Sequence, residues 1–139
     1  NLMFEFTENE RMSDPRHVEN IIGAYKALGF WTALDDFGAG YAGLCLLARL
    51  QPDLIKIDME LLRGIDASRP RQVIVSALAA IARELDITLL AEGVETEAEL
   101  TALRAAGIRL FQGYYFARPG FMSLPRVAGF QPLEVSVAG

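Results

Sequence analysis

The sequence predicts an α/β fold in which short parallel strands alternate with helices. Five short apolar runs, at 2–6, 30–34, 52–58, 87–93 and 108–113, are separated by segments with apolar residues at helical spacing. The runs are mostly continuous rather than alternating, which is typical of strands buried on both faces of a parallel sheet. Two arrangements fit this order: a flat doubly wound sheet, and part of an eight-stranded βα barrel.

Four helices are expected between these strands, and their ends carry ordinary helix signals. Pro15 suits the first helical position and Gly29 can close the same helix, while Thr96 and Glu99 have the spacing of a capping box. The expected helices cover 13–29, 42–50, about 69–85 and 96–107. The apolar residues expected to face the sheet are Val18, Ile21, Ile22, Tyr25 and Leu28 in the first helix, and Val73, Ile74, Ala77, Leu78, Ile81 and Leu85 in the third.

Composition and charge narrow the classes of function. The 139 residues suit one domain, and 52% of them are hydrophobic, which is enough for a core. The net charge of −5 argues against binding of a nucleic-acid polymer through its phosphates. The single cysteine, Cys45, excludes an intrachain disulfide, and no apolar run reaches the roughly 18–20 residues that cross a bilayer. A cytoplasmic location is therefore expected.

Polar side chains recur at the carboxyl ends of the predicted strands, where parallel α/β folds place their active sites. A single acidic residue at a strand end is usually a helix cap or a solvated charge. Five successive strands with a polar group at the same end favour a common site instead. The residues concerned are Glu5 and Glu8, Asp35 and Asp36, Lys56, Glu92 and Glu95, and Gln112.

The excess of acids in this set indicates a site for divalent metal ions. Adjacent carboxylates such as Asp35 and Asp36 repel each other, and bound cations keep them ionised together. Oxygen ligands favour Mg²⁺ or Mn²⁺ over zinc. Two such ions about 3.5–4 Å apart are a standard device for cleaving phosphoesters. The residues therefore favour a two-metal phosphodiester hydrolase.

Five ordered motifs resemble those of the EAL domain family: "FEFTE" (4–8), "DDFGAGYAGL" (35–44), "DLIKID" (53–58), "LAEGVET" (90–96) and "QGYYFARP" (112–119). The resemblance implies a modified (β/α)8 barrel. It also implies a metal-dependent phosphodiesterase that hydrolyses cyclic di-GMP to pGpG in bacterial second-messenger signalling, with Mg²⁺ or Mn²⁺ as cofactor and a homodimer as the assembly.

The resemblance implies a role for each matched residue. Asp35 looks like the aspartate that bridges two metals, and Asp36 looks like a ligand of the second. Glu5 looks like a ligand of the first metal and Glu92 of the second, and Lys56 looks like the lysine that orients the attacking water. Asp35, Lys56 and Glu92 are thus the expected catalytic residues. The expected substrate contacts are Gln112 and Arg118, and the expected supporting residues are Glu8 and Glu95.

The E-A-L motif and a ligand asparagine of the family are absent from these 139 residues, and a barrel of this type needs about 250 residues. We therefore expect a partial EAL domain that carries the carboxyl-terminal five strands or so. Residues 1–119 would form its βα core and 120–139 a tail. Such a chain is expected to be inactive alone and to associate with the rest of a barrel or with a second copy.

Two other functions stay open. A degenerate EAL domain would bind cyclic di-GMP or a protein partner without hydrolysis. An enolase-like barrel would abstract a proton beside a carboxylate, and it too places acids and a lysine at strand ends. That chemistry does not call for adjacent aspartates, so it explains Asp35 and Asp36 less well.

Overall fold

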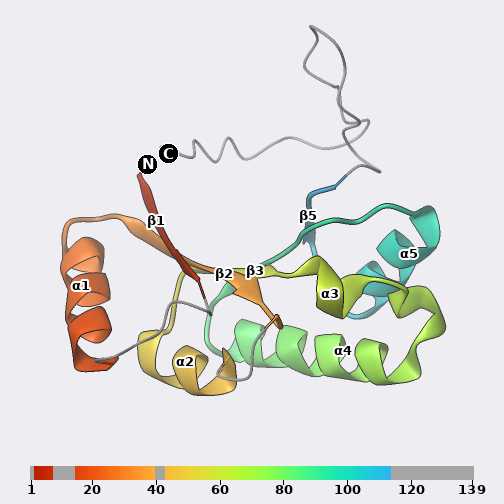
Figure 1. Ribbon diagram of the computed structural model, residues 1–139, viewed down its shortest axis with the longest axis horizontal. Coiled ribbons are helices and arrows are strands. Elements are labelled where there is room, and N and C mark those ends of the chain that lie inside the picture. Colours follow the sequence, from red (N-terminus) through yellow and green to blue (C-terminus); the bar gives the residue numbers. More distant parts are fainter. Residues whose placement is uncertain (1, 8–14, 40–42, 114–139) are drawn as a thin grey trace, which may run out of the picture.

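The computed structural model describes residues 2–7, 15–39 and 43–113, and their strands form a single parallel sheet (Figure 1). Each strand pairs with the next one along the chain, in parallel. The prediction of parallel βα repeats is therefore confirmed. The strands are β1 (Met3–Thr7), β2 (Trp31–Phe37), β3 (Leu54–Ile57), β4 (Thr88–Ala91) and β5 (Leu110–Phe111).

The strand order decides between the two arrangements that the sequence left open. A doubly wound sheet reverses its order at a switch point, whereas a barrel adds each strand beside the previous one. The order here is β1-β2-β3-β4-β5 without reversal. The longer helices also follow one side of the strands in Figure 1. They are α1 (Pro15–Ala27), α2 (Gly43–Leu50), α4 (Arg69–Glu84) and α5 (Glu97–Ala105). The described residues thus form an arc of barrel wall.

The core lies between the sheet and these helices. Leu34, Ile55 and Ile57 from the two middle strands have no exposed surface, and Val75 and Leu78 of α4 pack in the same cluster. All four residues of β3 are buried, as expected of a strand covered on both faces. The longest described helix, α4, has 16 residues, and none of the described helices is long and apolar enough to cross a membrane.

The predicted buried face of α4 is largely wrong. Leu78 is buried as expected, but Val75 and Ala82 fill the rest of the interface with the sheet. The other residues expected there, Val73, Ile74, Ala77, Ile81 and Leu85, are exposed. The helix carries two overlapping apolar sets at helical spacing, and the angle at which it meets the sheet selects one of them. In α1, Ile22 is buried as predicted, whereas Leu28, which was expected on the same face, lies just after the end of the helix and is 73% exposed.

Two short helical segments after β3 were not predicted. The first is α3 (Met59–Leu62), which starts where Asp58 Oδ1 accepts the Glu60 N–H at 2.8 Å. The second is η1 (Ile65–Ala67), and Gly64 between the two adopts a left-handed conformation with φ of 67°. These segments lead from the strand that carries Lys56 into α4.

The amino-terminal end of the sheet is held by a side-chain network. Thr32 of β2 is fully buried, and Asp53 lies just before β3. Asp53 Oδ2 accepts the Thr32 backbone N–H at 2.7 Å and the Thr32 hydroxyl at 2.8 Å. The Asp53 N–H donates in turn to the Thr32 carbonyl at 2.9 Å. This network fixes the start of β3 beside β2.

Candidate metal centre

A β-bulge brings the side chains of Asp35 and Asp36 to the same site. In a regular strand, neighbouring side chains point to opposite faces. The pairing of β2 with β3 shifts between Leu34 and Phe37, where β2 has one residue more than the matching stretch of β3. Asp36 adopts a left-handed backbone with φ of 55°, which aspartate tolerates better than most residues. The extra residue and this turn redirect the Asp36 carboxylate.

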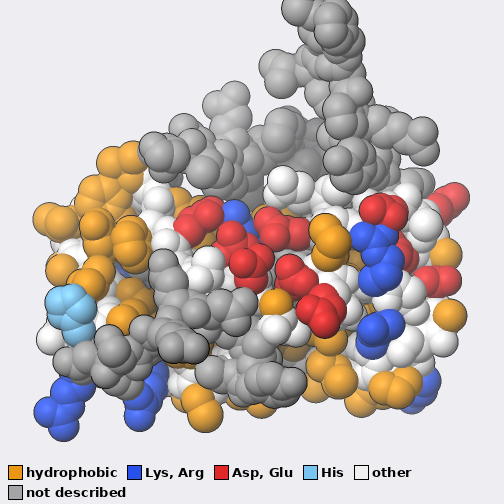
Figure 2. Space-filling model, viewed as in Figure 1, with side chains coloured by type: hydrophobic (Ala, Val, Ile, Leu, Met, Phe, Trp, Pro, Cys, Tyr) orange, Lys and Arg blue, Asp and Glu red, His pale blue; other side chains and the backbone are white. Residues whose placement is uncertain are grey.

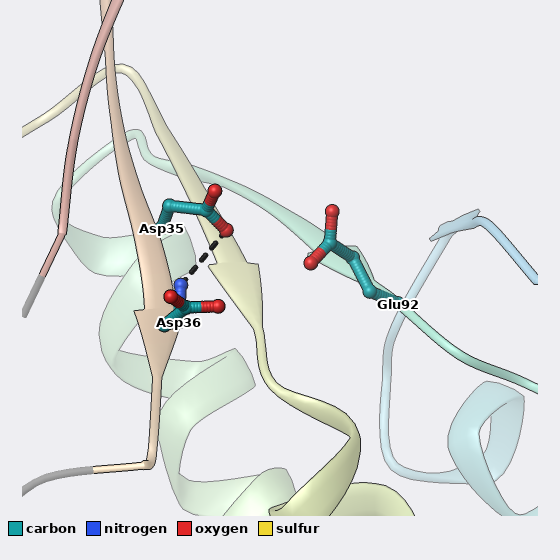
Figure 3. A group of neighbouring side chains, drawn as sticks. All are labelled: Asp35, Asp36 and Glu92. Atoms are coloured by element: carbon teal, nitrogen blue, oxygen red, sulfur yellow. Dashed lines mark hydrogen bonds between the residues drawn. The ribbon is translucent and has the colours of Figure 1, made fainter.

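Three carboxylates meet at the carboxyl ends of β2 and β4. Oxygens of Asp35, Asp36 and Glu92 lie within 4.8 Å of one another. Figure 3 shows Asp35 and Glu92 pointing toward each other from β2 and from the residue after β4. The Asp36 N–H donates to Asp35 Oδ1 at 2.8 Å, which orients the Asp35 carboxylate. All three residues are half-buried.

Lys56 on β3 lies beside this group, and Figure 2 shows the acidic side chains gathered around a basic one. Its Nζ is 2.6 Å from Glu5 Oε1 and 3.9 Å from Glu92 Oε1. The Glu5 oxygen is buried without a hydrogen bond. The Lys56 ammonium and the Glu5 carboxylate therefore form an ion pair. Glu5 Oε1 keeps lone pairs that a cation could accept.

The electrostatics of the site show an excess of negative charge. Burial raises the pKa of Glu92 from 4.5 to about 6, and the charge of Asp35 adds to the effect. Burial also raises the pKa of Asp36, with further contributions from Asp35 and Asp58. Burial lowers the pKa of Lys56, but the close Glu5 carboxylate and the charges of Asp35 and Glu92 outweigh this effect, so the net shift of the pKa is upward. One ammonium group does not balance these acids.

The donor set fits hard divalent cations. All the candidate donors are carboxylate oxygens, which Mg²⁺ and Mn²⁺ prefer. Opposite oxygens around one Mg²⁺ are about 4.2 Å apart, since each bond is about 2.1 Å. The oxygens of Asp35, Asp36 and Glu92 lie within 4.8 Å of one another, so their spacing is close to that of oxygens that share one metal ion. Glu5, Asp35, Asp36 and Glu92 are the residues that would hold the ions.

The family model for the EAL domain matches residues 1–119 of the chain. The chain belongs to the EAL domain family. The predicted resemblance is confirmed, and the five parallel strands are part of an EAL barrel.

Two curated EAL relatives come from Escherichia coli. The blue light- and temperature-regulated antirepressor BluF is 42% identical over 91% of this chain and 32% of its own length. The probable cyclic di-GMP phosphodiesterase PdeG is 39% identical over 86% of this chain and 24% of its own length. The chain thus spans less than a third of either relative.

Two solved EAL structures share the arrangement of the strands and helices. A standalone EAL protein from Vibrio cholerae, in its c-di-GMP-bound form, is 54% identical with a TM-score of 0.82, over 91% of this chain and 54% of that chain. The manganese and cyclic di-GMP complex of BlrP1 from Klebsiella pneumoniae at pH 9.0 is 46% identical with a TM-score of 0.80, over 84% of this chain and 30% of that chain.

The other residues expected from the EAL motifs are distributed differently. Glu95 lies in the loop before α5 and forms an ion pair with Arg63. Gln112 is exposed and hydrogen-bonds through its backbone to Ala91 and Val94. Glu8 and Arg118 lie outside the described residues. The structure therefore brings together Glu5, Asp35, Asp36, Lys56 and Glu92.

Three residues that lie near this site or link the loops beside it were not among the expected site residues. Asp58 raises the pKa of Asp36, and its place in the "KID" motif was the available signal. Arg63 joins the segment after β3 to the loop after β4, and no sequence signal marks it. Glu99 was expected only as half of a capping box. Thr96 Oγ1 does accept the Glu99 N–H at 3.1 Å, but the Glu99 carboxylate accepts from other backbone groups.

Proposed function

We propose that this chain belongs to a metal-dependent phosphodiesterase that hydrolyses cyclic di-GMP to pGpG in bacterial signalling. The observation that carries the proposal is the cluster of Glu5, Asp35, Asp36 and Glu92 around the buried Lys56. The cluster lies at the carboxyl ends of neighbouring parallel strands, which is where barrel enzymes hold their catalytic groups. Similar EAL proteins bind cyclic di-GMP, in one case together with manganese.

Each residue of the cluster has a distinct part in this proposal. Asp35 would bridge two cations, Asp36 and Glu92 would hold one of them, and Glu5 would hold the other. When bound, two divalent cations lower the pKa of a water molecule and offset charge that develops on the phosphate. Lys56 orients that water and adds a positive charge near the phosphate, because its raised pKa keeps it protonated at neutral pH. Mg²⁺ or Mn²⁺ is the proposed metal.

Four further residues belong to the proposal in outer positions. Gln112 and Arg118 are the proposed contacts to the dinucleotide. Glu8 and Glu95 are the proposed supporting residues. For Glu95 the ion pair with Arg63 is consistent with this role, because it fixes the loop that follows Glu92.

The test uses the complete EAL domain that contains these residues. The metal-stripped domain is incubated with cyclic di-GMP and either Mg²⁺, Mn²⁺ or EDTA, and pGpG is measured by chromatography. We expect hydrolysis with either metal and none with EDTA. Glu84→Gln removes one exposed negative charge at the end of α4 that leads into the amino-terminal end of β4, at the opposite end of the sheet from the cluster, and should leave the rate unchanged. Full activity in EDTA would overturn the two-metal proposal.

A second candidate function is a binding module without catalysis. BluF is named an antirepressor, and it is 42% identical to this chain. Kinship within the EAL family therefore leaves room for protein binding. Calorimetry separates the two functions, because a binding module would bind cyclic di-GMP with metal present and yet release no pGpG. The presence of Asp35, Asp36, Lys56 and Glu92 together favours the enzyme.

The proposed assembly follows from the partial barrel. We take residues 1–119 as its βα core and 120–139 as a tail. β1 and β5 end the strand order, so further barrel strands or a second copy of the chain would continue it there. Such a partner would also cover Leu2 and Trp31, which are 54% and 46% exposed. Light scattering after size-exclusion chromatography tests this assembly. A cytoplasmic location is proposed on the single cysteine.

A further inference from the structure

Within the described part of the chain, Glu99 is the only buried acidic residue, with 5% of its surface exposed. It lies in the first turn of α5, outside the metal cluster. A buried carboxylate is costly unless hydrogen-bond donors surround it. Its partners therefore indicate why the chain keeps an ionisable group at this position.

Both oxygens of Glu99 accept backbone hydrogen bonds, and the two donors lie on different loops. Oε1 accepts the N–H of Gly64 at 3.2 Å, in the segment that follows β3. Oε2 accepts the N–H of Glu95 at 3.0 Å, in the loop that follows β4. One carboxylate thus joins the segment downstream of Lys56 to the loop that carries Glu92.

The loop from Glu92 to Glu95 is packed closely enough to transmit a shift. Gly93 has φ of 74°, and a Cβ there would lie 2.8 Å from the Cβ of Met59 at the start of α3. The Glu92 N–H donates to the Ile57 carbonyl at 3.2 Å. The loop is therefore held against α3 at Gly93 and tied to Gly64 through Glu99. Among the described residues, loss of the tie would leave the four-residue loop that begins at Glu92 held near Glu95 only by the Val94 N–H bond to the Gln112 carbonyl and by the exposed Arg63–Glu95 ion pair.

A second link between the same two segments is weaker. Arg63 forms an ion pair with Glu95, but the two side chains are 41% and 46% exposed. Exposed pairs contribute little because water and salt screen them. Hydrogen bonds to a buried carboxylate are stronger. Glu99 is therefore the main connection between the segments.

We propose that Glu99 is a positioning residue that sets the distance between Glu92 and Lys56 by tying together the loops after β3 and β4. This inference rests on the proposed function. A carboxylate suits the task because it offers two acceptors to two N–H donors. Glutamine offers one acceptor, so Glu99→Gln should keep one of the two hydrogen bonds, and Glu99→Ala neither.

The test compares Glu99→Ala and Glu99→Gln with Thr96→Ala in the complete EAL domain. Thr96→Ala removes the cap of the same helix turn, since Thr96 Oγ1 accepts the Glu99 N–H, but leaves the tie in place. Mn²⁺ affinity is measured by calorimetry. Amide exchange at Gly64 and Glu95 is measured by NMR in the absence of metal. The values of kcat and KM are measured with cyclic di-GMP as the substrate. Arg63→Gln tests the exposed pair.

We expect Glu99→Ala to weaken Mn²⁺ binding and lower kcat about tenfold or more, as loss of groups that orient metal ligands does. KM should change little, and the Gly64 and Glu95 amides should exchange faster. Glu99→Gln should fall between Glu99→Ala and the wild type. Thr96→Ala should keep the wild-type Mn²⁺ affinity and kcat, and Arg63→Gln should change both by much less than Glu99→Ala does.

Two results would overturn the inference. The first is a Glu99→Ala domain that loses stability as Thr96→Ala does but keeps wild-type Mn²⁺ affinity, kcat and amide exchange. The second result applies if Glu99→Ala does not fold: wild-type Mn²⁺ affinity, kcat and amide exchange in Glu99→Gln would then overturn the inference. If the wild type binds Mn²⁺ but does not hydrolyse cyclic di-GMP, only the proposed function is overturned. Mn²⁺ affinity and amide exchange would still test the connection that Glu99 makes between the two loops.

Discussion

The two ends of the sheet use aspartate in opposite ways. At the amino-terminal end, Asp53 accepts a neutral N–H and a hydroxyl from Thr32, both within 2.8 Å. At the carboxyl-terminal end, Asp36 faces Asp35 and Asp58, and burial among these charges raises its pKa. Neutral, matched donors make a carboxylate stabilising, whereas like charges make it costly. The first end holds the fold together and the second is suited to binding cations.

The largest expected effect is on activity at the carboxyl-terminal end. Asp35→Asn keeps an oxygen for the Asp36 N–H but removes the charge that a bridging ligand needs. Loss of an outer partner of a metal ligand costs about 10–100-fold, so loss of the ligand itself should lower kcat by at least about 100-fold. Stability without metal should not fall. A rate within threefold of the wild type, measured by pGpG release, would exclude Asp35 as a bridge.

A smaller effect, on stability alone, is expected at the amino-terminal end. Asp53→Ala leaves the buried N–H and hydroxyl of Thr32 without their acceptor. Such unsatisfied groups cost about 1–3 kcal/mol, so we expect a loss of about 2 kcal/mol in urea unfolding. The kcat of the folded fraction should stay at the wild-type value. A large fall in kcat at unchanged stability would contradict the division between the two ends.

The smallest expected effect is a gain in stability that depends on pH. The folded-state pKa of Glu92 is raised from 4.5 to about 6, so its ionisation opposes folding. This penalty is absent below about pH 4.5 and complete above about pH 6. The whole shift corresponds to about 2 kcal/mol, and water around the partly exposed side chain screens about half of it, so Glu92→Gln should stabilise the metal-free domain by about 1 kcal/mol at pH 8 and by nothing at pH 4. Equal unfolding free energies for the two proteins at pH 8 would show that Glu92 is not strained.

The strands and the convergence of Asp35, Lys56 and Glu92 could be predicted from the sequence, because both follow from local pattern. Lys56 and Glu92 interrupt or end apolar runs, and such positions converge in any parallel sheet. The bulge at Asp36 could not be predicted, because register depends on how two strands pair. The ties made by Arg63 and Glu99 join residues that lie 32 and 35 positions from their partners, and no local pattern encodes such contacts.

The buried face of α4 could not be predicted for a related reason. Val73 and Val75 both belong to helically spaced apolar sets, yet one is 50% exposed and the other fully buried. Periodicity identifies a face only when one set is polar. In α4 the sheet makes the choice.

The most direct test of the account is the effect of Mn²⁺ on unfolding of the metal-stripped complete domain at pH 8. A ligand that binds the folded state raises its stability according to its concentration and affinity. We predict a clear rise in the unfolding midpoint for the wild type, the same rise for Asp53→Ala from a lower starting value, and a much smaller rise for Asp36→Asn. No rise in the wild type, or the same rise in Asp36→Asn, would contradict the claim that the carboxyl-terminal cluster is a cation site.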